Sequence, residues 1–168
     1  MIIKRNNPGN IRKAASFTWQ GELPGISAGD LVTFDTLQNG YRAQLKLLNT
    51  YVKNGHNTLT KIIERYAPAS DNNPTAQYIG AGGVNFVESG TSINRDTVIH
   101  ADDYDTLSKI AYQMSLFEHG VSNDDGTLQA ALNKAKQLLT GIVDIAKNNP
   151  GTVMTAAFAV LIIYLLWD

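Results

Sequence analysis

Residues 102–120 read DDYDTLSKIAYQMSLFEHG, and this stretch predicts an amphipathic helix in a mainly α-helical domain. Asp102 or Asp103 can cap its first turn, because an aspartate side chain accepts hydrogen bonds from the free N–H groups at a helix start. Gly120 lies just past its end, where a left-handed residue stops a helix. Between these limits apolar side chains recur at helical spacing, at Leu107, Ile110, Ala111, Met114 and Phe117.

Three further helices are predicted upstream. Apolar residues share one face over residues 41–52, and Gly55 ends that helix. A second helix begins with Asn57 or Thr58 as its cap and ends before Pro68. A third covers residues 73–79, because an asparagine followed by a proline suits a helix start. Residues 6–40 are rich in Gly, Pro, Asn and aromatic side chains and predict loops with a small β-hairpin, and the glycine-rich residues 80–90 predict no helix.

The C-terminal part predicts a stalk and a membrane anchor. After the polar break SNDDG at residues 122–126, an amphipathic helix is expected over Thr127–Lys147. Residues 151–167 then carry no charge, and a helix of that length reaches about 25 Å, near the lower limit for crossing a bilayer core. The alternative is a buried C-terminal helix of a soluble domain. The predicted division is a domain over residues 1–121, a linker and stalk over 122–150 and a transmembrane anchor over 151–168.

The composition limits the kinds of functional site that this chain can form. The chain has 168 residues, no cysteine and three scattered histidines, so we expect no metal site and no cofactor. The formal net charge of -1 argues against a nucleic-acid binder. Residues 1–65 nevertheless hold nine Lys/Arg against four Asp/Glu, while residues 66–125 hold two against nine. The basic first part suits an anionic polymer such as a cell-wall glycan, and the alternative is ordinary solvated faces.

Glu118 is the candidate catalytic acid. It follows Leu107, Ala111 and Met114 at spacings of four, three and four residues, so it extends the apolar face of its helix. Burial there favours the protonated carboxylic acid, which is the form that donates a proton to a glycosidic oxygen. The alternative is a helix that frays at Phe117 and leaves Glu118 solvated.

Several sequence motifs resemble a known family in their order along the chain. They are Asn6-Asn7-Pro8-Gly9-Asn10-Ile11-Arg12, Trp19-Gln20-Gly21, Phe34 with Gly40-Tyr41-Arg42-Ala43, Tyr66-Ala67-Pro68, and Asn73-Pro74-Thr75 with Tyr78. Over roughly residues 5–120 the chain resembles phage-encoded virion proteins of the peptidoglycan-degrading, lysozyme-like kind. Phe117-Glu118-His119-Gly120 is similar to the Glu-Ser-Gly motif of lytic transglycosylases and glucosaminidases. It comes last here, as in a circular permutation, and His119 replaces the usual Ser or Asn.

The resemblance implies a lysozyme-like fold and cleavage of peptidoglycan between N-acetylmuramic acid and N-acetylglucosamine. Glu118 is then the general acid. The resemblance also implies that Tyr78 holds the substrate and that Asn10 and Trp19 line the cleft. Glu22 is a further candidate for lining it, because it follows Trp19 and Gly21 in the loop region. A lytic transglycosylase is favoured over a two-carboxylate muramidase, although Asp71, Asp124 or Asp125 can still supply a second carboxylate.

Two other functions also fit the sequence. The main rival is a non-enzymatic, membrane-anchored virion protein with a structural or glycan-binding role, and a more distant one contacts nucleic acid.

The N-terminus has no apolar stretch suited to a signal peptide. Lysines precede the apolar segment, which would leave the domain on the cytoplasmic side of a host membrane. A virion with an internal membrane resolves this conflict, with the host inner membrane as the alternative, and other virion proteins are possible partners.

Overall fold

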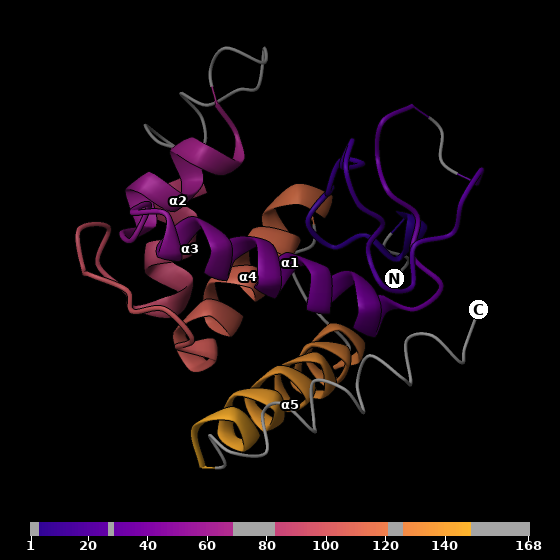
Figure 1. Ribbon diagram of the computed structural model, residues 1–168. Helices are drawn as coiled ribbons and strands as arrows, with labels where there is room; N and C mark the ends of the chain where they lie inside the picture. Colours follow the sequence, from indigo (N-terminus) through magenta and orange to yellow (C-terminus); the bar gives the residue numbers. More distant parts are fainter. Residues whose placement is uncertain (1–3, 27–28, 69–82, 121–125, 149–168) are drawn as a thin grey trace.

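The computed structural model describes residues 4–26, 29–68, 83–120 and 126–148. Within these ranges the chain is mainly α-helical, as predicted, with five α-helices and a short 3-10 turn at Lys4–Asn6 (Figure 1). The helices are α1 (Leu37–Lys53), α2 (Leu59–Tyr66), α3 (Gly83–Thr91), α4 (Tyr104–His119) and α5 (Thr127–Asn148).

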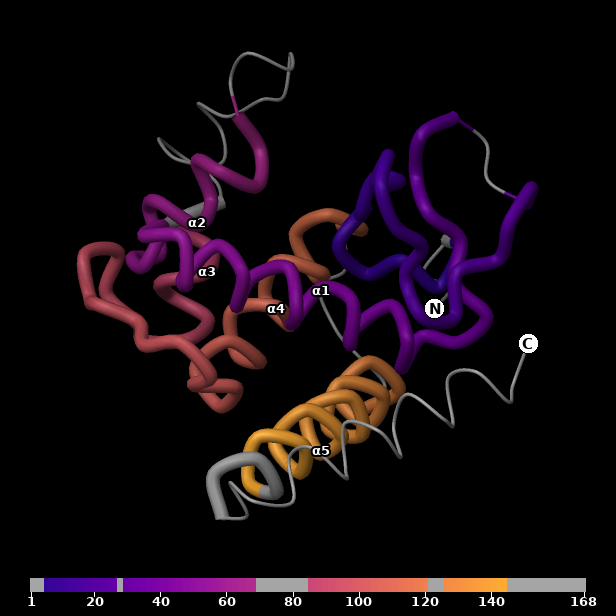
Figure 2. Tube along the Cα trace, viewed as in Figure 1, coloured from indigo at the N-terminus to yellow at the C-terminus, as the bar shows by residue number. Residues whose placement is uncertain are grey.

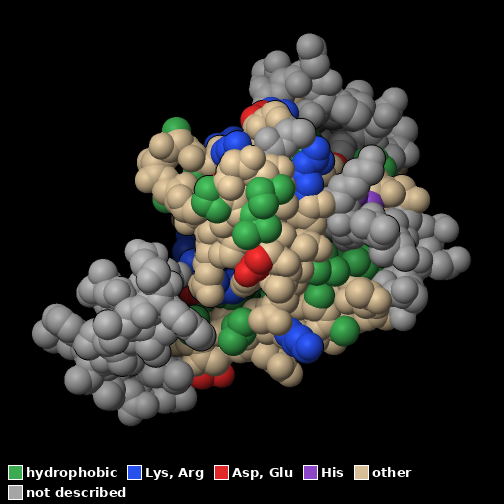
Figure 3. All heavy atoms as spheres, turned by 90° about the vertical axis from the view of Figure 1, so that its right-hand side faces the viewer, with side chains coloured by type: hydrophobic (Ala, Val, Ile, Leu, Met, Phe, Trp, Pro, Cys, Tyr) green, Lys and Arg blue, Asp and Glu red, His purple; other side chains and the backbone are tan. Residues whose placement is uncertain are grey.

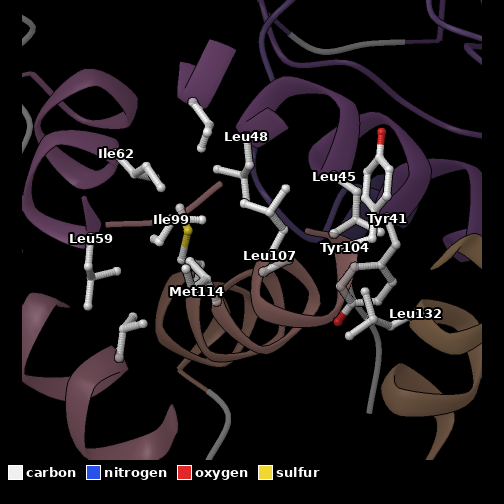
Figure 4. Close-up of a cluster of buried hydrophobic side chains, with 14 of the residues drawn as sticks. Tyr41, Leu45, Leu48, Leu59, Ile62, Ile99, Tyr104, Leu107, Met114 and Leu132 are labelled. Atoms are coloured by element: carbon white, nitrogen blue, oxygen red, sulfur yellow. The ribbon is translucent and has the colours of Figure 1, made fainter. Parts of the chain in front are cut away.

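Helices α1 and α4 lie at the centre of the core. Their buried apolar side chains meet those of α2 and α5 in one cluster, which Figure 4 shows from α1 residues Leu45 and Leu48 to Leu132 of α5. The hydroxyl groups of Tyr41 on α1 and Ser115 on α4 are 2.7 Å apart inside this core, and both residues are fully buried. This hydrogen bond satisfies two polar groups that would otherwise be costly to bury.

Helices α2, α4 and α5 begin and end close to the predicted residues. Thr58 caps α2 and Asp103 caps α4, each by accepting a hydrogen bond from the N–H three residues later. Gly120 follows α4 with φ of 61°, the left-handed geometry expected of a stop. Helix α1 begins at Leu37, earlier than predicted, because Thr36 caps it.

Helix α3 is a correction to the sequence-based prediction. Its residues lie in the glycine-rich stretch for which no helix was predicted. A Cβ on Gly90 would lie only 2.3 Å from the amide of Gln113 on α4, so glycine permits the two helices to pack closely. Val87 is fully buried, and the rings of Phe86 and Phe117 are 5.8 Å apart between centroids. Packing against α4 thus outweighs the low helix propensity of glycine.

The N-terminal loops form the second part of the fold. Among the residues described, no strand is formed, so the predicted hairpin is reduced to isolated antiparallel bridges between Arg12 and Leu31 and between Glu22 and Phe34. A small separate cluster holds these loops against α1, with Ile11, Val32, Phe34 and Ala43 buried. Figure 2 shows the loops at the N-terminal end of α1, beside the C-terminal end of α4.

Helix α5 covers the sequence predicted for a stalk, but it packs on the domain. Its apolar face contributes Leu128, Leu132, Ala135 and Leu139 to the large core, where it contacts α1 and α4. Lys136 also forms an ion pair with Asp105 of α4, at 2.9 Å. The amphipathic pattern therefore serves the packing of the domain.

Two predicted elements lie outside the described residues. These are the helix over residues 73–79 and the membrane anchor over residues 151–168. In the described ranges, no helix has both the length and the apolar character needed to cross a membrane.

Candidate functional site

The candidate site is built around Glu118, at the last turn of α4. The helix continues through His119, so the expected alternative of fraying at Phe117 is not found. The Nε2 atom of His119 is 3.2 Å from the backbone carbonyl oxygen of Asn7, which joins this end of α4 to the N-terminal loops. Glu118 is partly buried at this junction.

Asn7 shapes the loop that faces Glu118. Its side chain is almost fully buried and makes three hydrogen bonds. Its amide donates to the carbonyl oxygens of Ile11 and Val32, each at 2.9 Å, and its Oδ1 accepts from the N–H of Ile11 at 2.8 Å. A buried asparagine with all these partners holds the turn between residues 7 and 11 in one conformation.

Asn10 lies in that turn and contacts the candidate acid. Its φ of 47° is left-handed, a conformation that asparagine tolerates better than most residues. Its Nδ2 donates to the Oε2 of Glu118 at 2.7 Å, across 108 positions of sequence. Hydrogen bonds to a charged carboxylate are shorter and stronger than neutral ones. The turn therefore brings Asn10 and Glu118 together.

Tyr66 holds the other side of this turn. Its hydroxyl donates a hydrogen bond to the carbonyl oxygen of Gly9. A Cβ on Gly9 would lie 2.4 Å from that hydroxyl oxygen, so the approach requires glycine. Burial raises the pKa of Tyr66 well above its usual value, and the charge of Glu118 and the neighbouring Tyr51 raise it further. Tyr66 is therefore a neutral hydrogen-bond donor at physiological pH.

Asn10, Tyr66 and Glu118 line a groove of about 670 Å³, within the usual range for ligand sites. One wall comes from the N-terminal loops and the other from α1 and α2, with the end of α4 between them (Figure 1). The walls are rich in aromatic side chains, namely Phe17, Trp19, Tyr51, Tyr66 and Phe117. Such a surface offers flat apolar faces beside the carboxylate of Glu118.

The sequence-predicted residues are distributed unequally around the groove. Asn10, Trp19 and Glu118 line it. Trp19 packs edge-on against Phe17, with centroids 4.8 Å apart. Glu22 is not among the lining residues: its Oε2 accepts a hydrogen bond from the N–H of Trp19 at 2.9 Å, so it orders the loop. Tyr78 lies outside the described residues.

Among the described residues, Glu118 is the only acid that lines the groove. The three candidates for a second carboxylate, Asp71, Asp124 and Asp125, lie outside the described ranges. The described part of the chain also contains no group of three or more His, Asp or Glu side chains arranged to hold a metal ion.

Several residues that line the groove were not identified from the sequence as parts of a site, among them Lys13, Tyr51, Arg65, Tyr66 and Phe117. Tyr66 and Phe117 stood within motifs used for the family resemblance, and those motifs were the available signals. Tyr51 and Arg65 lie on helices where periodicity marks them only as core or surface positions. The guanidinium carbon of Arg65 lies 5.4 Å from the centroid of the Tyr51 ring, which places both at the groove wall.

No protein-family model matches the chain, and no curated protein matches it.

Proposed function

We propose that this protein cleaves the glycan strand of peptidoglycan, with Glu118 as the general acid. The observation that carries the proposal is the position of one carboxylate, Glu118, in an aromatic-walled groove, with the amide of Asn10 bound to it at 2.7 Å. A carboxylic acid beside the scissile bond is the central requirement of glycosidase chemistry. Aromatic faces such as those of Phe17 and Trp19 suit the apolar faces of sugar rings.

The proposed reaction is of the lytic transglycosylase type. Glu118 donates its proton to the glycosidic oxygen as the bond from that oxygen to the anomeric carbon breaks. The sugar's own primary hydroxyl oxygen then bonds to the anomeric carbon, and its proton returns to the Glu118 carboxylate. Asn10 stabilises the carboxylate that exists between these two steps, because its amide donates to Oε2. This scheme needs one carboxylate, in keeping with the described part of the groove.

Tyr66 has a positioning role in this scheme. Its hydroxyl holds the carbonyl of Gly9, the residue before Asn10. The raised pKa of Tyr66 keeps that hydroxyl protonated. A fixed turn keeps the amide of Asn10 on Glu118, and such preorganisation lowers the cost of developing charge in the reaction.

The test is cleavage of purified cell walls by the wild type and by Glu118→Gln. Clearing in a zymogram should be lost in Glu118→Gln, while its circular dichroism spectrum is unchanged. Glu64→Gln is the matched control, because Glu64 is an exposed residue of α2 that does not line the groove. Cleavage that persists in Glu118→Gln overturns the assignment of the acid. Wild-type protein that binds walls without cutting them supports the non-enzymatic alternative.

Mass spectrometry of the released ends distinguishes the two enzymatic outcomes. Anhydro ends support the transglycosylase reaction, because the ring closes on the sugar itself. Free reducing ends indicate hydrolysis and a water activated by a second carboxylate.

The proposed location is a virion, with residues 151–167 anchored in its membrane. The support is the uncharged, apolar sequence of that segment. Purified particles should contain the protein, and detergent should be needed to release it. Recovery only from host membranes, or release by salt alone, contradicts this location.

A further inference from the structure

The groove carries an excess of positive charge. Among the residues that the structure describes, three basic side chains line it, namely Arg12, Lys13 and Arg65, against the one acid Glu118. Figure 3, viewed from the side that carries the N-terminal loops, shows basic side chains interspersed with hydrophobic ones. A cleft lined by one sign of charge concentrates ligands of the opposite sign.

Arg12 is the basic residue whose charge is already compensated. It forms an ion pair with Asp30 of the same loop region, and both side chains are mostly exposed. This pair accompanies the bridge between Arg12 and Leu31 and so belongs to the structure of the loop.

Lys13 and Arg65 are different, because neither forms an ion pair with any acid in the described part of the chain. Lys13 comes from the N-terminal loop and Arg65 from α2, so they approach the groove from its two walls. The guanidinium of Arg65 rests on the ring of Tyr51, which orients it without neutralising it. Both side chains are exposed and accessible to a ligand.

The amino-sugar backbone of an intact peptidoglycan strand carries no charge, because the lactyl carboxyl of each muramic acid is held in the amide bond to a short peptide. The free carboxylates of the intact polymer belong to this peptide. Two cations in the groove therefore have no partner on the backbone of an intact strand, whereas a peptide carboxylate matches them. Arginine is especially suited to this, because its planar fork can bind a carboxylate through two parallel hydrogen bonds.

We propose that Lys13 and Arg65 bind a carboxylate of the stem peptide, so that the protein prefers strands with free peptide carboxylates over strands in which these carboxylates are blocked. This specificity rests on the proposed glycan substrate. Glu118 and Asn10 act on the glycosidic bond, while Lys13 and Arg65 select the strand by its side branch. Because the groove is open to solvent at both cations, the preference should weaken at high salt.

The experiment compares two substrates prepared from the same purified walls: soluble strands with their native stem peptides, and the same strands after carbodiimide coupling to ammonia has converted the peptide carboxylates into neutral carboxamides. Initial cleavage rates are measured for wild type, Lys13→Gln, Arg65→Gln and the double variant. The wild type should favour the strands with native peptides. Each single variant should reduce the ratio of the two rates by about threefold, as expected for a partly exposed ion pair, and the double variant should reduce it further.

Lys134→Gln is the control for charge alone, because Lys134 is exposed on α5 and does not line the groove. It should keep the wild-type ratio. A circular dichroism spectrum and melting temperature for each variant establish that it is folded. Arg65→Lys adds a further readout: it keeps the charge but loses the planar fork, so it should retain only part of the preference.

The outcomes separate the inference from the proposed function. Equal wild-type rates on both substrates, or an unchanged ratio in the double variant, overturn the stem-peptide assignment while cleavage itself stands. If neither substrate is cut, the proposed function fails, and affinity for the two immobilised strands then tests the inference. Stronger binding to strands with native peptide carboxylates that is lost in the double variant supports it, and equal binding to native and amidated strands overturns it.

Discussion

The hydrogen bond between Asn10 and Glu118 can be removed with little other change. Asn10 has a φ of 47°, a left-handed geometry that glycine adopts without strain. Asn10→Gly therefore deletes the amide that lies 2.7 Å from Oε2 of Glu118 and leaves the backbone of the turn free to keep its shape. Alanine is a poorer choice, because a Cβ in this conformation costs about 1–2 kcal/mol.

The expected effect on activity follows from the type of hydrogen bond. A hydrogen bond to a charged group contributes about 1.5–3 kcal/mol. If this interaction is made with the carboxylate that forms during the reaction, its loss lowers kcat/KM by about 10- to 100-fold. The effect on folding is smaller, about 1 kcal/mol, because glycine regains part of the loss by relieving the left-handed backbone.

Asn6→Gly is the matched control. Asn6 also has a left-handed φ, of 50°, and its amide also makes hydrogen bonds, to the carbonyl oxygens of Phe34 and Asp35 at 3.0 and 3.1 Å. These bonds hold the loop and do not involve Glu118. We expect Asn6→Gly to lower the free energy of unfolding by an amount similar to or larger than Asn10→Gly does, with a much smaller loss of kcat/KM.

The assay is dye release from labelled cell walls, with urea unfolding measured on the same samples. The diagnostic result is that kcat/KM falls much further in Asn10→Gly than in Asn6→Gly, although the free energy of unfolding falls at least as much in Asn6→Gly. A folded Asn10→Gly variant that loses less than about threefold of its activity refutes the role of this hydrogen bond. The magnitudes assigned to a charged hydrogen bond would then not apply at this site.

Three further predictions concern residues that stabilise the fold, and two of these residues, Gly9 and Tyr66, line the groove. Gly9→Ala should destabilise the protein by about 1–3 kcal/mol and lower its melting temperature, because the new Cβ would lie 2.4 Å from the Tyr66 hydroxyl and 2.9 Å from the side chain of Gln44; an unchanged melting temperature contradicts the close approach. The raised pKa of Tyr66 contributes stability that is present below pH 10.0 and is lost as the pH rises toward the folded-state pKa. Tyr66→Phe should therefore flatten the fall in the free energy of unfolding at alkaline pH. A pH profile identical to that of the wild type would count against this contribution. Hydrogen bonds from Arg95 lower the pKa of Glu88 below 4.5, so Glu88 contributes to the free energy of unfolding above that pH, and this contribution is lost as the pH falls through the lowered value. Glu88→Gln should therefore weaken the fall in the free energy of unfolding at acid pH, measured by urea titration. An unchanged fall at acid pH rules out this contribution.

Local signals predicted most of the helices well. The caps at Thr58 and Asp103 and the stop at Gly120 work through atoms within four residues in sequence, so their chemistry can be recognised without the fold. Helix α3 was missed for the opposite reason. Its glycines disfavour a helix locally, and the stabilisation that compensates for them comes from packing against Gln113 and Phe117 on α4.

The candidate site was predictable in part. Glu118 and Asn10 were identified separately, one from helical spacing and one from a family resemblance. Their hydrogen bond spans 108 positions, and nothing in either local pattern specifies it. Glu22 was a candidate for the cleft, yet its carboxylate caps the N–H of Trp19, an interaction that depends on the path of the loop.

The sequence by itself determined that the described chain is mainly helical and that α4 stops at Gly120. It also determined that a carboxylate stands on the apolar side of the last turn of α4. These features depend on spacing and capping along one segment. Only the tertiary structure decided that the loop around Gly9 and Asn10 meets that carboxylate, that Tyr66 supports the loop from α2, and that α5 is part of the core. Each of these depends on close packing between segments distant in sequence. The physical reason is that burial and short-range hydrogen bonds act between whichever groups the fold brings into contact, and periodicity along a single helix does not specify its partner.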